Sequence, residues 1–193
     1  MTHNQSATDN LTAMRRQDRA VADDTWIKAF LAACPHGVLA TVSEGSPFVH
    51  TNTFVYDEIT HAIYLHTAGE GRLRTNVEVN AHVSFCASRM GRLLPAKTAR
   101  EFSVEYESVI IFGRGSIVTD MELAREKMQL LMDKYFGHLK PGADYRPITD
   151  KEIAEISVFR LSIDSWSAKR KVVEDNFPGA FWFGERLQSS KDN

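Results

Sequence analysis

The sequence has little cysteine, no excess of either charge and no long hydrophobic run, and each absence excludes a class of protein. Only Cys34 and Cys86 occur among 193 residues, which predicts neither a disulfide framework nor a metal site. The 23 basic and 25 acidic residues leave a net charge of −2, which gives no general attraction for nucleic acid. The longest apolar runs, residues 37–42 and 109–112, fall far short of the roughly 20 residues of a membrane helix. We therefore expect a cytoplasmic protein that binds neither nucleic acid nor membrane.

Several catalytic signatures are missing as well. The sequence contains no Walker A motif, no G-x-G-x-x-G, no H-E-x-x-H and no G-x-S-x-G, so the common nucleotide-binding, zinc-protease and hydrolase classes lose their usual support. Its composition, 43% hydrophobic and 25% charged, is that of a globular domain. We expect a flexible N-terminal segment over residues 1–20, a single domain over 21–187 and a frayed tail over 188–193.

Short runs of β type make up most of that domain, and helical patterns occur between and after them. The segments with one-face helical spacing are 24–34, with Asp23 or Asp24 as the N-cap, 72–80, 121–135, and 149–155, with a capping box between Thr149 and Glu152. The expected strands cover residues 37–42, 48–56, 62–67, 83–88, 102–118 and 156–166. The pattern predicts a mainly β, α+β fold, a six-stranded antiparallel split barrel with peripheral helices. In 102–118 the alternation predicts a wet face that carries Glu105 and Glu107, and Gly113 and Gly115 predict a bulge or sharp bend.

A glycine-rich turn links the strand at 62–67 to the helix at 72–80. Gly69 and Gly71 allow the backbone to approach a ligand closely, and the first amides of the helix point outward. Arg72 and Arg74 add guanidinium groups, which suit phosphate. The combination predicts an anion site, and a plain turn with two solvated arginines is the alternative.

The strand at 48–56 carries four consecutive polar side chains, at His50, Thr51, Asn52 and Thr53. Polar groups inside a barrel need hydrogen-bond partners, so part of this set could contact a polar ligand such as the ring edge or ribityl chain of a flavin. An edge strand whose side chains face water is the alternative.

These segments together resemble the pyridoxamine 5′-phosphate oxidase-like flavoproteins, and among them the branch of the nitroimidazole-resistance proteins. The shared pattern, over residues 14–166, consists of GVLAT from Gly37, SPFVH from Ser46, IYLHTAxxGR from Ile63, NAHVSF from Asn80 and YESVIIFG from Tyr106. The resemblance implies FMN bound at a homodimer interface. It also implies an oxidoreductase that moves electrons between FMN and a small planar molecule, nitro-aromatic reduction included. A flavin- or haem-storing barrel without turnover, or a purely structural barrel, is the alternative.

The resemblance also implies roles for individual residues. Arg72 matches the arginine that holds the flavin phosphate, and Thr67 matches a residue that contacts the phosphate or ribityl chain. Thr51, Asn52 and Thr53, next to His50, match the strand that lines the flavin ring. His66 matches the characteristic histidine of the nitroimidazole-resistance branch; it could act as a general acid, bind haem or be a structural histidine.

Two parts of the sequence depart from the family pattern. Leu73 stands where the family usually has a lysine, so Leu73 and Arg74 are included as candidate phosphate contacts, with Arg74 as the possible substitute. Trp166, Lys169 and Arg170 resemble the C-terminal region that completes the flavin site, although with a different spacing. A solvated basic face is the alternative for the two cations.

Overall fold

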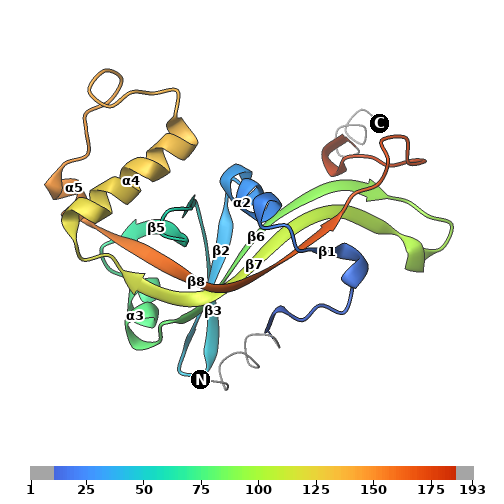
Figure 1. Ribbon diagram of the computed structural model, residues 1–193, viewed down its shortest axis with the longest axis horizontal. Helices are drawn as coiled ribbons and strands as arrows, with labels where there is room; N and C mark the ends of the chain where they lie inside the picture. Colours follow the sequence, from blue (N-terminus) through green and yellow to red (C-terminus); the bar gives the residue numbers. More distant parts are fainter. Residues whose placement is uncertain (1–10, 186–193) are drawn as a thin grey trace, which may run out of the picture.

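The computed structural model describes residues 11–185. Their eight strands form one antiparallel sheet, in the order β3-β2-β6-β7-β8-β5-β4 with β1 paired to β8, and the sheet curls into an open barrel (Figure 1). The strands are β1 (Ala20–Val21), β2 (Gly37–Ser43), β3 (Ser46–Asn52), β4 (Val55–Asp57), β5 (Ala62–Ala68), β6 (His82–Leu94), β7 (Ser103–Ile117) and β8 (Ile156–Lys171). The helices are α2 (Asp24–Ala33), α3 (Arg72–Val79), α4 (Met121–Phe136) and α5 (Asp150–Ala154), with short 3-10 turns at η1 (Gln17–Arg19) and η2 (Ala99–Glu101).

The predicted mainly β fold is confirmed, but the strand count is eight rather than six. The expected strand at 48–56 breaks after Asn52 into β3 and β4, because β4 pairs with β5 while β3 pairs with β2. In addition, Ala20 pairs with Lys169, inside the flexible N-terminal segment expected over residues 1–20. Residues 1–10 of that segment, and the expected tail at 188–193, lie outside the described residues.

Two apolar clusters stabilise the barrel. The first fills its interior, where Ile27 and Leu31 of α2 pack against Leu39, Phe85 and Ile111 of the sheet. Helix α2 begins as the sequence predicts, because the Asp23 side chain accepts a hydrogen bond from the backbone N–H of Thr25 at 2.9 Å.

The second cluster lies on the outside of β5 and β8, where α4 and α5 cover Tyr64 and Val158. The expected capping box of α5, between Thr149 and Glu152, is present. No helix within residues 11–185 is long and apolar enough to cross a membrane.

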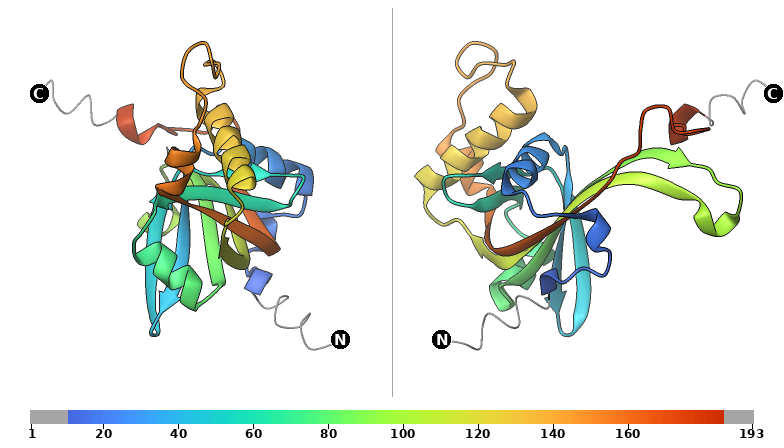
Figure 2. Two further views of the ribbon diagram at one scale, coloured as in Figure 1. Left: turned by 90° about the vertical axis from the view of Figure 1, so that its left-hand side faces the viewer. Right: turned by 45° about the vertical axis from the view of Figure 1, so that its right-hand side comes forward.

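Beyond the barrel, β6, β7 and β8 continue as a long projecting ribbon, here called the arm (Figures 1 and 2). The sequence prediction ended two of these strands too early, at 88 and 166, whereas β6 reaches Leu94 and β8 reaches Lys171. The expected bend at the glycines of β7 is confirmed, since the register with β8 shifts between Phe112 and Gly113. A Cβ on Gly113 would lie 2.0 Å from the Ser162 carbonyl oxygen, which makes glycine necessary there.

The prediction for the two faces of β7 was wrong. Glu105, expected on a wet face, is only 7% exposed, and Val109 and Ile111 of the same face are fully buried. On the opposite face, Ile110 is 36% exposed. Burial of the carboxylate is possible because a guanidinium group pairs with it, which an alternation pattern does not reveal.

Candidate functional site

The loop between β5 and α3 presents free backbone amides to open space. Gly71 is the N-cap of α3 and has φ +142°. Glycine has no side chain that could accept a hydrogen bond from the first helix amides. A Cβ placed on Gly71 would meet no described heavy atom within 4 Å. The first intrahelical bond runs from the Thr75 N–H to the Gly71 carbonyl, at 3.2 Å, so the amides before it are available to a ligand. Such a helix start suits an anion.

Arg72 follows this loop directly, as the first residue of α3. Its guanidinium carbon lies 5.3 Å from the centre of the Phe48 ring on β3, and the side chain is exposed. Among residues 11–185 it forms no ion pair with Asp or Glu. The charge of Arg72 is therefore available to a bound phosphate, as its match to the family arginine implies.

Leu73 and Arg74 do not complete the site in the way the sequence suggested. Leu73 is buried in the barrel core, because it faces inward on the first turn of α3. Arg74 turns back into the fold, where it donates to the Gly69 carbonyl at 3.2 Å, to the Ser157 hydroxyl at 2.9 Å and to Glu78 at 2.9 Å. We correct both assignments: Leu73 packs the core, and Arg74 fixes the shape of the loop rather than replacing the family lysine.

The polar strand next to this loop is an edge strand. Within the described chain β3 pairs only with β2, and the side chains of Thr51 and Thr53 are exposed while that of His50 is half-buried. Asn52 has an internal partner, since its Nδ2 donates to the His66 carbonyl at 2.7 Å. That bond joins β3 to β5 across the opening of the barrel and brings the polar strand beside the 66–72 loop.

His66 lies at the end of β5, in register with Val158, on the face that α4 and α5 cover. Burial lowers the pKa of its imidazole, so the ring is neutral near pH 7. Its Nδ1 is buried and has no hydrogen-bond partner within residues 11–185. Next to it, the Thr67 hydroxyl donates to the Ala68 carbonyl at 3.0 Å. His66 thus keeps an unused nitrogen close to the loop.

The three C-terminal candidates lie elsewhere in the chain. Strands rise about 3.3 Å per residue, so Trp166 is about 30 Å along β8 from Ser157 at the loop. The Trp166 indole donates to Asp24 at 2.9 Å, and Lys169 is in register with Ala20. Arg170 lies on the opposite face of β8 from Lys169, 3.1 Å from Glu107. One chain therefore brings His50–Thr53 and His66–Arg74 together, and leaves Trp166, Lys169 and Arg170 apart.

A hollow that the sequence did not reveal lies on the outer face of the sheet. It measures ≈ 830 Å³, and its lining includes Ala40, Ser84, Phe112 and Ser165, which are cross-strand neighbours on β2, β6, β7 and β8. The Ser165 hydroxyl is buried and has no partner in the described part of the chain. The available signal was the three small residues Ala40, Ser84 and Ser165 at matching positions of their strands, which leave room above the sheet beside Phe112.

Comparison with known proteins identifies the family of this chain. The family model for pyridoxamine 5′-phosphate oxidase matches residues 23–170, more than half of the sequence. The chain belongs to the pyridoxamine 5′-phosphate oxidase family. A comparison with curated proteins finds no match.

Solved structures similar to this family member include the flavocytochrome Anf3 from Azotobacter vinelandii. That pair shares 26% identity over 90% of this chain and 81% of the other, with a TM-score of 0.73. The FAD and heme binding protein from Mycobacterium smegmatis is 20% identical over 89% of this chain and 80% of its own, with a TM-score of 0.70. A protein from Bacteroides thetaiotaomicron named for 5-nitroimidazole antibiotic resistance is 20% identical over 78% and 86%, with a TM-score of 0.65. The last two likenesses establish the fold.

The described residues of this oxidase-family chain form no group of metal ligands. Within residues 11–185, no three His, Cys, Asp or Glu side chains are placed to hold a metal ion together. The candidate site is therefore described by its amides, one free guanidinium group and one neutral imidazole.

Proposed function

We propose that this protein binds FMN as a homodimer and moves electrons between the flavin and a small planar molecule. The observation that carries the proposal is the start of α3, where the uncapped amides of its first turn, residues 72–74, and the free charge of Arg72 lie beside a polar strand. Amides and guanidinium groups are the donors that a phosphate monoester needs. Membership of the pyridoxamine 5′-phosphate oxidase family supports the same choice.

A second copy of the chain explains the candidates that lie far from the loop. Trp166 and Lys169 lie nine and twelve residues along β8 from Ser157, and their partners in the same chain, Asp24 and Ala20, are not residues of the loop. The outer face of the sheet, with its hollow of ≈ 830 Å³, leaves Val42, Val49 and Ile110 exposed. A two-fold dimer through that face would cover these side chains and would allow the partner to complete the flavin site.

The protein's own contribution to the chemistry is positioning. A bound flavin supplies the redox chemistry, and the chain holds its phosphate, lines its ring with the polar residues of β3 and limits access of water. His66 is neutral near pH 7, so it can hold or move a proton at Nδ1. The acceptor we propose is a planar molecule such as a nitro-aromatic compound, in line with the named resistance protein of the same fold.

The proposal is tested by FMN titration of the purified full chain, with identification of any chromophore released from the protein as isolated. Loss of a hydrogen-bonded charge costs about 1.5–3 kcal/mol, so Arg72→Gln should weaken FMN binding roughly 10- to 150-fold. Arg146→Gln is the matched control, because Arg146 is an exposed arginine that pairs with Glu152 outside the site. Failure to take up FMN, or equal affinity in Arg72→Gln and the native protein, would refute the proposal.

Turnover separates the enzyme from the storage alternative. We expect the reduced flavoprotein to be reoxidised by a 5-nitroimidazole under anaerobic conditions, and His66→Ala to slow that step. Bound flavin that no nitro-aromatic compound reoxidises would instead favour a carrier without turnover.

Haem binding is a second candidate function, and the unused Nδ1 of His66 favours it. A buried, neutral imidazole with a free nitrogen is the kind of group that serves as an axial ligand of haem iron. The flavocytochrome Anf3 shares 26% identity with this chain. Titration with haem should then give a Soret band that His66→Ala abolishes, whereas His82→Ala, at an exposed histidine, should leave it intact. No Soret shift in either protein would exclude this candidate.

A further inference from the structure

A second cavity, of ≈ 350 Å³, lies on the arm and is remote from the 66–72 loop. Its lining includes Arg89 of β6, Glu107 of β7, Arg170 of β8 and Trp182 of the C-terminal segment. Arg170 is 13 residues from Ser157, which corresponds to about 40 Å along β8. The volume is at the low end of the range for small-molecule sites, which is enough for one small ring system.

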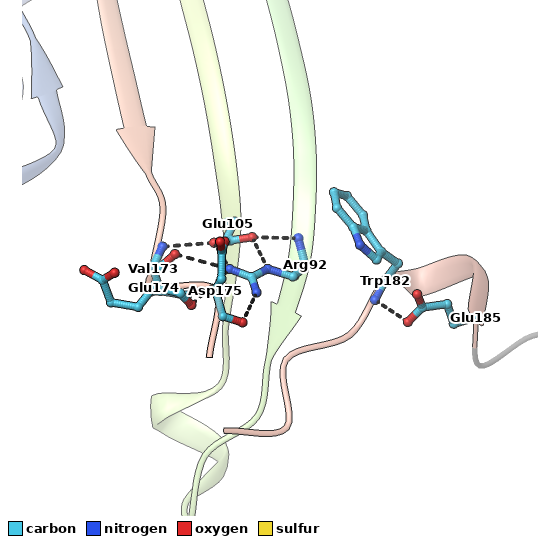
Figure 3. Close-up of polar contacts among 7 residues, drawn as sticks. All are labelled: Arg92, Glu105, Val173, Glu174, Asp175, Trp182 and Glu185. Atoms are coloured by element: carbon cyan, nitrogen blue, oxygen red, sulfur yellow. Dashed lines mark hydrogen bonds and ion pairs between the residues drawn. The ribbon is translucent and has the colours of Figure 1, made fainter. Parts of the chain in front are cut away.

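A buried ion pair fixes one wall of this cavity and holds the C-terminal segment in place (Figure 3). Arg92 donates to both oxygens of Glu105, from Nε at 2.8 Å and from Nη2 at 2.9 Å, and neither side chain is well exposed. Glu105 also accepts from the Val173 N–H at 2.9 Å, and Arg92 donates to the Asp175 carbonyl at 2.9 Å. The hydrogen-bonded guanidinium of Arg92 lowers the pKa of Glu105 to about 2, so the carboxylate stays ionised and its negative charge offsets the positive charge of Arg92.

Trp182 is positioned by the same segment. Phe181, its chain neighbour, exchanges two backbone hydrogen bonds with Leu93 of β6, at 2.8 and 3.2 Å. The Trp182 N–H donates to Glu185 at 3.0 Å, which closes the turn behind it. The indole therefore stands over the cavity with about half of its surface exposed, at 52%.

The charges that face the cavity do not balance. Among the described residues that line the cavity, Glu107 is the only carboxylate left after the Arg92–Glu105 pair, and two guanidinium groups share it: Arg89 donates from Nε at 3.0 Å, and Arg170 lies 3.1 Å away. One positive charge is therefore left over. Within residues 11–185, Nη1 of Arg89 and both Nη groups of Arg170 have no hydrogen-bond acceptor. These donors have the fork geometry that recognises a carboxylate.

We propose that this cavity binds a small planar monoanion of the aromatic carboxylate class. The carboxylate of the ligand is bound by the free donors of Arg170 and Arg89, and its ring packs against the Trp182 indole. One positive charge in excess selects a monoanion over a neutral ring, and the cavity volume limits the ligand to a single ring system.

Benzoate and its neutral isostere benzamide are the probes, titrated into the full chain by calorimetry. We expect benzoate to bind at least tenfold more tightly than benzamide. Arg170→Gln should weaken benzoate roughly tenfold or more, because a charged hydrogen-bond partner is lost. Glu107→Gln should strengthen benzoate binding, because it frees both guanidinium groups for the ligand.

Arg72→Gln is the control for binding at the proposed flavin site, and it should leave the benzoate affinity unchanged. Equal affinity for benzoate and benzamide would overturn the proposal. So would an Arg170→Gln or Glu107→Gln variant that folds and binds benzoate as the native protein does. Loss of benzoate binding in Arg72→Gln would likewise refute it, since the anion would then be bound at the loop.

Discussion

Lys134 of α4 is a half-buried ammonium group without a carboxylate partner among the described residues. Its Nζ donates to three backbone carbonyls, of Leu31 at 3.1 Å, of Cys34 at 2.9 Å and of Phe54 at 2.9 Å. It also lies 3.8 Å from the centre of the Phe54 ring. These contacts join α4 to the end of α2 and to the start of β4, so the Lys134 ammonium group holds these three segments together. Burial lowers the pKa of Lys134 from 10.5 to about 8.

This shift makes stability depend on pH in a defined window. Between pH 8 and 10.5 the unfolded chain binds a proton at Lys134 that the folded chain lacks, so the free energy of unfolding rises with pH there. The shift of about 2.5 pH units corresponds to about 3 kcal/mol in total. At pH 9 the expected slope is roughly 1.2 kcal/mol per pH unit, since nearly one proton separates the two states.

Urea denaturation of the native chain and of Lys134→Met, at each pH from 7 to 10, measures this contribution. The unfolding free energy of the native chain minus that of the variant should rise by about 2.5 kcal/mol over this range. The lost carbonyl contacts add only a constant offset. Lys97→Met, at an exposed lysine, is the matched control and should give a flat difference. A flat difference for Lys134→Met would refute the reasoning, because it would mean that the buried amine titrates as it does in water.

Three further predictions concern the arm and the sheet. Glu105→Gln should release the segment 172–185, which limited proteolysis would detect as faster cleavage there; unchanged cleavage would mean that the segment is held by other contacts. Gly113→Ala places a Cβ 2.0 Å from a backbone oxygen, so it should lower the melting temperature markedly, whereas Gly184→Ala, in open space, should not. Ile110→Lys should shift the proposed dimer to monomer in sedimentation while the fold persists, and a dimer of unchanged stability would place the interface elsewhere.

Local signals of the fold were predictable from the sequence. Helix caps depend on residues two or three positions apart, so Asp23 and the Thr149–Glu152 pair could be identified directly. The ends of β6 and β8 could not, because each strand is extended by hydrogen bonds to β7, which is distant in sequence. The arm exists because these three strands continue to pair beyond the barrel.

The candidate site divides in the same way. The turn, the helix start and Arg72 follow from consecutive residues, and the structure keeps them together. Arg74 could not be assigned, because its partner Ser157 is 83 positions away and decides where the guanidinium points. Leu73 was predictable, because the helical spacing over residues 72–80 already places it on the inward face; only its match to a family lysine position suggested a phosphate contact.

The wrong assignment of the faces of β7 bears on the dimer. A strand with one wet face shows apolar residues on one side only, whereas β7 has Val109 and Ile111 on the buried side and Ile110 and Phe112 on the other. Apolar residues on both sides are typical of a strand that is covered on both faces. In a single chain the barrel core covers one face, and the other remains exposed beside the hollow of ≈ 830 Å³. The sequence pattern therefore agrees with the proposed second copy, which would cover the face that one chain leaves open.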